Sequence, residues 1–273
     1  MRLNDGNEIP PLGLGTYPLK GAEAEKAVAS AIDVGYRHID TAVNYRNEEA
    51  VGRGLATSGI ARDQIQVATK LPGRDHGFNE TLASCERSRT ALGVDYIDLY
   101  LIHWPNPSVG KYVETWRAMI ELRDRGLVRS IGVSNFTEEF LTRLVDETGV
   151  TPAVNQVELH PYFPQAELRA FHAANGIVTE AWSPLGKNSA VRSESAVGAA
   201  AEAHGVTPAQ VVLRWHLQLD SVPIPKSGDT TRQKQNLDVL GFELSADEVA
   251  AITALSRPDG RLFGGDPNTH EEM

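Results

Sequence analysis

Strand-like apolar runs alternate with amphipathic helical segments along this chain, and short polar connections separate them. This alternation predicts a parallel sheet whose strands are joined by crossover helices. The predicted strands cover residues 13–16, 38–41, 67–71, 97–102, 130–133, 154–159, 178–183 and 222–225. The predicted helices cover residues 23–34, 48–58, 79–92, 111–125, 138–147, 165–174, 208–218 and 230–240. Eight strand–helix units predict a (β/α)₈ TIM barrel, and 273 residues suit one barrel domain, which needs about 250.

Three segments add to this plain repeat. Residues 194–204 and 246–255 predict two extra helices, and Ser245 with Glu248 has the spacing of a capping box. Near the start, an Asp5-Gly6 turn between two short arms predicts a β-hairpin. We expect this hairpin to plug the bottom of a single barrel domain that spans residues 1–273.

The alternative fold is an open, doubly wound sheet. A dinucleotide-binding sheet of that kind usually begins with G-x-G-x-x-G after its first strand. Here the segment reads Gly13-Leu14-Gly15-Thr16-Tyr17-Pro18, which lacks the third glycine and runs into a proline. A nicotinamide cofactor would therefore bind by another route.

Composition narrows the classes of partner. The net charge of −10 argues against nucleic acid, and no apolar run approaches the roughly 18 residues of a membrane span. Cys85 is the only cysteine, so no internal disulfide forms, which is compatible with a cytoplasmic location. The histidines have no ligand spacing, so we predict no metal site.

Four polar residues stand at or just beyond the ends of predicted strands: Asp40, Tyr45, Lys70 and His103. The carboxyl ends of all strands in a parallel barrel meet at one mouth, where barrel enzymes do their chemistry. Lys70 and Asp40 could form a structural ion pair and nothing more. They could also tune Tyr45, because an adjacent cation lowers the pKa of a phenol from about 10 and makes it a better proton donor. His103 could then orient a carbonyl group.

Several motifs resemble the aldo-keto reductases, and in particular their prokaryotic branch that contains the diketogluconate reductases. These motifs are Gly35-Tyr36-Arg37-His38-Ile39-Asp40-Thr41-Ala42, Thr69-Lys70, Ile102-His103-Trp104-Pro105, Ile131-Gly132-Val133-Ser134-Asn135-Phe136 and Ile224-Pro225-Lys226-Ser227. The resemblance implies a (β/α)₈ barrel that reduces carbonyl groups with NADPH. It maps the family's catalytic tetrad onto Asp40, Tyr45, Lys70 and His103, with Tyr45 as the general acid.

Other residues near strand ends suit a nicotinamide cofactor. Ser134, Asn135 and Gln156 can meet the acceptor and the two donors of a carboxamide, although Ser134 and Asn135 also favour ordinary turns. The resemblance implies that these three contact the nicotinamide and that Trp182 stacks on its ring. It further implies cofactor contacts from Gly15, Thr16, Ser183 and Leu185.

A second group suits a phosphate. Lys226, Ser227 and Arg232 place two cations and a hydroxyl near a predicted helix start, which is either an anion site or a solvated basic face. The resemblance implies that they hold the 2′-phosphate of the adenosine. It also implies that Gln235 and Asn236 flank the adenine, with Gln235 where glutamate is common.

Tyr17, Trp104 and Phe263 are expected to line the substrate pocket, with the tail after Arg257 as its main cover. The loops beside this pocket are short, which predicts a broad range of small activated carbonyls, dicarbonyls and keto sugars as substrates. A monomer is the expectation from the resemblance. Two other functions remain open: a Schiff-base aldolase built on Lys70, and a non-catalytic subunit that senses NADPH.

Overall fold

The computed structural model describes residues 1–187 and 189–273, and it contains one parallel sheet in the order β1 to β8. The strands are β1 (Leu14–Gly15), β2 (His38–Asp40), β3 (Gln66–Leu71), β4 (Ile97–Ile102), β5 (Val128–Ser134), β6 (Val154–Glu158), β7 (Val178–Trp182) and β8 (Ser221–Pro223). A parallel bridge between Gly15 and Lys226 joins β1 to the segment that follows β8 and closes the ring. Gly15 permits this approach, because a Cβ there would lie 2.6 Å from the carbonyl oxygen of Ile224. The predicted barrel is confirmed.

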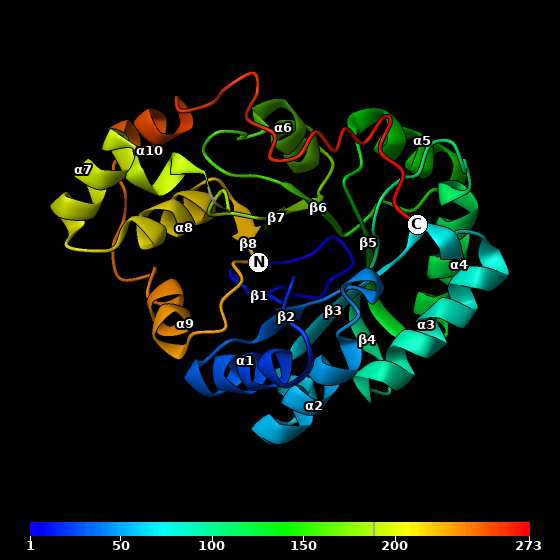
Figure 1. Cartoon of the computed structure of the whole chain (residues 1–273). Helices are drawn as coiled ribbons and strands as arrows, with labels where there is room; N and C mark the ends of the chain where they lie inside the picture. The colour runs from blue at the N-terminus through cyan, green and yellow to red at the C-terminus, as the bar shows by residue number, and fades with distance from the viewer. Residues whose placement is uncertain (188) are drawn as a thin grey trace.

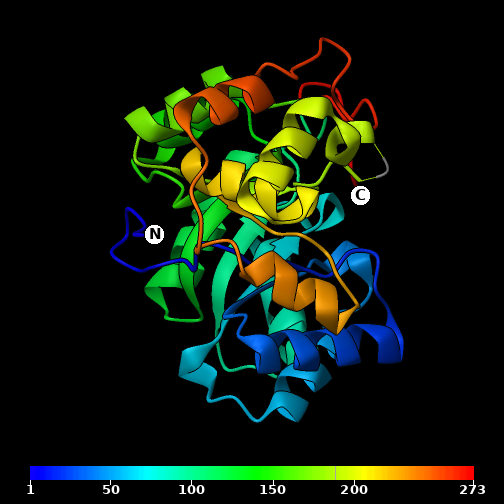
Figure 2. The same cartoon turned by 90° about the vertical axis from the view of Figure 1, so that its left-hand side faces the viewer.

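Helices surround the strands on the outside of the ring (Figure 1). They are α1 (Gly21–Val34), α2 (Glu48–Ser58), α3 (Phe78–Leu92), α4 (Tyr112–Asp124), α5 (Glu138–Thr148), α6 (Ala166–Ala174), α7 (Ser195–His204), α8 (Pro208–Gln218), α9 (Thr230–Leu237) and α10 (Ala246–Thr253). The extra helices predicted from the sequence are α7 and α10. Helix α9 lies beside α1, so the two ends of the repeat meet (Figure 2). Within the described residues, no helix is both long and apolar enough to cross a bilayer.

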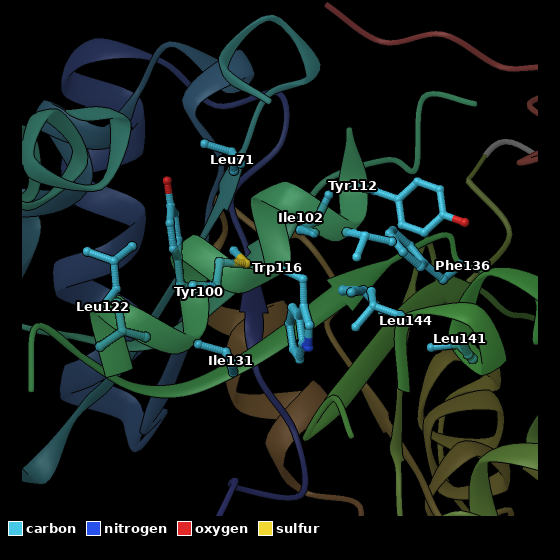
Figure 3. Close-up of a cluster of buried hydrophobic side chains, with 14 of the residues drawn as sticks. Leu71, Tyr100, Ile102, Tyr112, Trp116, Leu122, Ile131, Phe136, Leu141 and Leu144 are labelled. Carbon is cyan, nitrogen blue, oxygen red and sulfur yellow. The ribbon is translucent and has the colours of Figure 1, made fainter. Parts of the chain in front are cut away.

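The apolar side chains form an outer layer between strands and helices. Its largest group surrounds Tyr100, Trp116 and Phe136, which are fully buried or nearly so (Figure 3). Tyr100 and Ile102 of β4 point outward into this layer, while Leu99 and Leu101 belong to a separate cluster inside the barrel. The alternation of side chains along each strand therefore separates an outer apolar layer from the barrel interior.

The N-terminal hairpin closes the bottom of the barrel, as predicted. Arg2 and Glu8 form an antiparallel bridge, and the amide of Leu3 donates to the carbonyl of Asn7 at 2.8 Å. Leu3 and Ile9 are buried in the interior cluster that also holds Leu99. The hairpin and the C-terminus lie on opposite sides of the barrel (Figure 2). The end of the barrel away from the hairpin is therefore the one where a functional site can form.

We expect Ile9→Ala to lower the free energy of unfolding by about 2–5 kcal/mol, because it leaves a cavity where the hairpin fills the barrel. Ile9 is 1% exposed. Urea denaturation measures the change. Leu240→Ala is the matched control: Leu240 is 66% exposed, and its loss should change stability by no more than about 0.5 kcal/mol. Equal losses in the two variants would contradict a packed plug.

Candidate active site

The centre of the site is a buried ion pair between neighbouring strands. Lys70 of β3 donates to both carboxylate oxygens of Asp40 at 2.7 Å and to the carbonyl of Thr41 at 2.8 Å. Its side chain has no exposed surface, so its ammonium group depends on these three oxygens in place of water. Tyr45 follows Asp40 on a short loop and places its hydroxyl 3.5 Å from Lys70 Nζ.

The pKa of Tyr45 shifts in the opposite direction to the one predicted from the sequence. Burial raises the pKa of Tyr45 to about 12, and the opposing effect of the Lys70 cation is smaller. The expected depression of this pKa is therefore not found in the structure. Although burial favours the neutral amine, Asp40 and Tyr45 hold the pKa of Lys70 above its usual value. Tyr45 thus remains a protonated phenol at neutral pH, next to an ammonium ion.

His103 follows the end of β4 and completes the group. Its ring meets the Tyr45 ring edge-on, with centroids 5.7 Å apart. His103 Nδ1 lies 3.0 Å from Oε1 of Glu272, which comes from the C-terminal tail. Burial favours the neutral acid, but His103 and other neighbours keep the pKa of Glu272 below its usual value. All four predicted tetrad residues therefore meet at the mouth, and a fifth residue joins them.

The tail is anchored so that Glu272 reaches this position. Asn106 donates to the carbonyl of Glu272 at 2.5 Å and accepts from its amide at 3.2 Å. The amide of Ser108 donates to the Glu271 carboxylate at 2.8 Å. A Cβ on Gly73 would lie 1.8 Å from Asn106 Nδ2, so glycine is needed where the tail docks. The sequence analysis missed Glu272, because an acid in a polar tail looks like a solvated residue.

Aromatic side chains surround the mouth. The rings of Tyr17 and Tyr45 are 5.2 Å apart, and Phe263 stacks on Trp182 at 5.5 Å. Phe263 also meets Trp104 at 6.5 Å. Each of the three residues expected to line the substrate pocket therefore contacts another aromatic ring at the mouth. His270, which the sequence did not single out, packs on Trp104 at 4.2 Å.

The residues predicted to hold a carboxamide lie together where the end of β5 pairs with the middle of β6. The hydroxyl of Ser134 donates to the backbone carbonyl of Gln156 at 2.8 Å. Asn135 adopts a left-handed backbone conformation, with φ of 62°, and its amide donates to the carbonyl of His103 at 3.0 Å. Trp182 Nε1 donates to Asn135 Oδ1 at 2.9 Å. These contacts leave the side-chain oxygen of Gln156 without a hydrogen-bond donor among the described residues, so it can accept one from a carboxamide.

Of the three residues predicted to bind a phosphate, Ser227 is already hydrogen-bonded, whereas Lys226 and Arg232 are exposed. Ser227 exchanges hydrogen bonds of 3.1 Å with the backbone of Asp229, whose carboxylate caps α9. Arg232 has a 69% exposed side chain and lies 3.9 Å from that carboxylate. Lys226 is exposed too. Both cations can therefore approach an anion. That anion would compete with the Asp229 carboxylate for Arg232.

The remaining predicted cofactor residues differ in their exposure to solvent. Thr16 is buried and accepts from Asn47 at 3.2 Å. Gln235 is exposed and Asn236 is buried. Ser183 and Leu185 are partly buried on the loop after β7. No group of three or more potential metal ligands occurs in the described part of the chain.

The sequence analysis also missed two buried residues, His38 and Glu180. His38 Nε2 lies 2.7 Å from Glu180 Oε1 inside the barrel. A usable signal existed for both: His38 is two residues before Asp40, and Glu180 is two before Trp182. Residues two apart on a strand share a face, so these side chains point the same way as the predicted site residues Asp40 and Trp182.

Comparison with known proteins agrees with this geometry. The sequence model of the aldo/keto reductase family matches residues 11–257. A Corynebacterium protein named 2,5-diketo-D-gluconic acid reductase B is 60% identical over 271 residues, covering 99% of this chain and 97% of its own.

Solved structures match equally well along the chain. A variant of Gox0644 in complex with NADPH has a TM-score of 0.95 and 48% identity, covering 99% of this chain and 98% of its own. An aldo-keto reductase of Bombyx mori in complex with NADP has a TM-score of 0.92 and 36% identity, covering 99% and 97% of the two chains. This protein belongs to the aldo/keto reductase family.

Proposed function

We propose that this protein reduces small activated carbonyl compounds to alcohols with NADPH, and that Tyr45 is the general acid. The observation that carries the proposal is the placement of a protonated phenol 3.5 Å from a buried, ion-paired lysine. When bound, NADPH supplies a hydride to the carbonyl carbon. The cofactor assignment is supported by two structural relatives that were solved with NADPH or NADP.

In this proposal each tetrad residue has a separate task. Tyr45 donates its proton to the carbonyl oxygen, and the Lys70 ammonium stabilises the phenolate that remains. Asp40 keeps Lys70 charged, which it does through two hydrogen bonds of 2.7 Å. His103 orients the carbonyl oxygen beside Tyr45. The same contacts argue against an aldolase, because a Schiff-base lysine must lose its proton to act as a nucleophile.

We propose that the cofactor lies along the carboxyl ends of the strands. Gln156, Asn135 and Ser134 would meet the carboxamide, and Trp182 would face the nicotinamide ring. Because Phe263 already covers one face of Trp182, either the ring uses the other face or Phe263 moves. Lys226 and Arg232 would hold the 2′-phosphate, with Ser227 beside them. The other contacts expected from the family are those of Gly15, Thr16, Ser183, Leu185, Gln235 and Asn236.

The substrate pocket combines aromatic walls with the carboxylate of Glu272 and with one cation, Lys187, whose Nζ lies 5.7 Å from the centre of the Tyr17 ring and 5.3 Å from that of Phe263. Tyr17 and Phe263 are exposed, whereas Trp104 is only 5% exposed and packs against Phe263 and His270. The open walls are therefore mostly apolar, and such pockets discriminate weakly between substrates of similar size. Glu272 lies where a substrate oxygen would approach His103. A substrate must therefore displace the tip of the tail, and an anionic substrate must also approach a carboxylate. The name of the Corynebacterium relative makes keto sugar acids a test case for this pocket.

Tyr45→Phe should lower kcat by about 10²- to 10⁴-fold, because the substitution keeps the aromatic ring but removes the hydroxyl group that donates the proton. NADPH affinity, measured by calorimetry, should stay within a few-fold of the wild-type value. Tyr96→Phe is the control: Tyr96 lies against Arg62 and Arg129, away from the tetrad, and its hydroxyl has no role in the proposal. Near-normal turnover in Tyr45→Phe would remove this phenol from the mechanism.

Arg232→Ala should weaken NADPH binding by roughly 10- to 100-fold and hardly change NADH binding, because charge-assisted hydrogen bonds are worth about 1.5–3 kcal/mol. Calorimetry with both cofactors measures the difference. Lys234→Ala, an exposed cation on the same helix, should affect neither cofactor selectively. If Arg232→Ala weakens both cofactors alike, the guanidinium serves a group that NADH also carries.

Deleting residues 262–273 should alter KM for several carbonyl substrates while leaving NADPH affinity nearly intact, because the tail covers the pocket. Glu272→Gln removes a single negative charge from the tail and so tests the effect of that charge alone. It should lower KM for an α-keto acid at least about 5-fold more than for its neutral ester, since a like charge at contact distance costs about 1 kcal/mol even in water.

Glu271→Gln provides the matched control for this charge, because Glu271 contacts Ser108 instead of His103. Its effect on the keto acid should be smaller than that of Glu272→Gln. A preference above about 10⁴ for one substrate in the wild-type protein would contradict a weakly discriminating pocket.

A further inference from the structure

A second buried ion pair lies inside the barrel, beneath the tetrad. His38 of β2 and Glu180 of β7 are both fully buried, and their side chains meet at 2.7 Å. The other ring nitrogen of His38 has no hydrogen-bond partner within the described residues. A Cβ on Gly13 would lie 2.3 Å from His38 Cδ2, so the ring fills the space that this glycine leaves. The histidine is thus held by Glu180 and by close packing.

The surroundings favour the charged forms of both groups. Burial disfavours the imidazolium, yet Glu180 and nearby carboxylates keep the pKa of His38 above its usual value. Burial likewise disfavours the carboxylate, but His38 and a hydrogen bond from Gln156 keep the pKa of Glu180 below its usual value. Well-packed apolar residues would often stabilise a core as well as a buried ion pair does. Stability alone therefore does not explain why charges occupy this place.

Gln156 connects this pair to the tetrad. Its amide nitrogen donates to Glu180 Oε2 at 2.6 Å and to Asp40 Oδ2 at 2.9 Å. An amide has two N–H groups, and each carboxylate takes one of them. Gln156 and Glu180 are direct neighbours in the β6–β7 register, whereas Asp40 reaches them from β2 on the far side of the ring. Rotation of the amide by 180° would turn its oxygen toward both carboxylates, so its orientation is determined.

We propose that Glu180, held by His38, is a positioning residue that fixes the orientation of Gln156. Gln156 then presents its side-chain oxygen to the N–H₂ of the nicotinamide carboxamide, while its nitrogen stays on Asp40. This inference rests on the proposed function, because it assumes that NADPH binds at this mouth. Neither Glu180 nor His38 touches the reacting atoms.

The test compares NADPH with its 3-acetylpyridine analogue, which has no carboxamide N–H₂ to donate. Glu180→Leu removes one of the two acceptors of the Gln156 amide nitrogen and leaves only Asp40, so the orientation of the amide is held less firmly. The variant should bind NADPH about 3- to 10-fold more weakly, as expected for one neutral hydrogen bond, and should bind the analogue within about 2-fold of wild type. Calorimetry measures both affinities, and their ratio is insensitive to a general loss of stability.

Two further variants guard against a misfolded Glu180→Leu. Glu180→Gln keeps an oxygen for Gln156 and should restore the wild-type affinity ratio. Glu180→Asp keeps the charge for His38 but withdraws the carboxylate from Gln156, so it should show the selective loss. Asp98→Asn is the matched control, because Asp98 is a buried carboxylate paired with Arg62 at 2.6 Å and does not contact Gln156. It should reduce stability without changing the ratio.

Equal weakening of both cofactors by Glu180→Leu and Glu180→Asp would overturn the proposal, and so would wild-type affinities in both folded variants. A wild-type protein that bound no NADPH would refute the proposed function itself, before any variant is compared.

Discussion

The buried contact between Lys70 and Asp40 is the interaction on which the rest of the site depends. An ammonium ion without exposed surface needs compensating oxygens, and Asp40 with the carbonyl of Thr41 supplies them at 2.7–2.8 Å. Asp40 in turn accepts from Gln156. The polar groups at the mouth therefore form one connected network with the charges deeper in the barrel, and a partner removed at one point leaves another group unpaired.

This network divides the barrel interior into layers of different character. At the bottom, Leu3 and Ile9 of the hairpin pack against apolar strand residues. Above them lies the polar layer of His38, Glu180 and Gln156, and at the mouth lies the tetrad. Such layers are expected when alternate residues of parallel strands point inward. The polar layers are linked by hydrogen bonds through Gln156, so the proposed cofactor site and the proposed proton donor share one network.

Much of this architecture could be predicted from the sequence, for a physical reason. Parallel strands carry their carboxyl ends to one mouth, so the meeting of Asp40, Lys70 and His103 followed from strand boundaries alone. The contact between Glu272 and His103 could not be predicted in this way. The C-terminal tail has no helical or strand periodicity in its sequence from which its position could be inferred. The pairing of His38 with Glu180 requires knowledge of how the ring closes. The pKa of Tyr45 was misjudged because burial, which a sequence does not display, outweighs the neighbouring cation.

The distribution of tryptophans has a spectroscopic consequence. Trp104 and Trp182 stand at the mouth among Phe263 and His270, whereas Trp116 and Trp215 are fully buried in the outer layer. The buried indoles donate to Val150 and Thr253, so their surroundings stay constant while the fold persists. Indole emission depends on local polarity, and a reduced nicotinamide absorbs in the range where indole emits. The chain thus carries two native fluorophores that report on its mouth and two that report on its core.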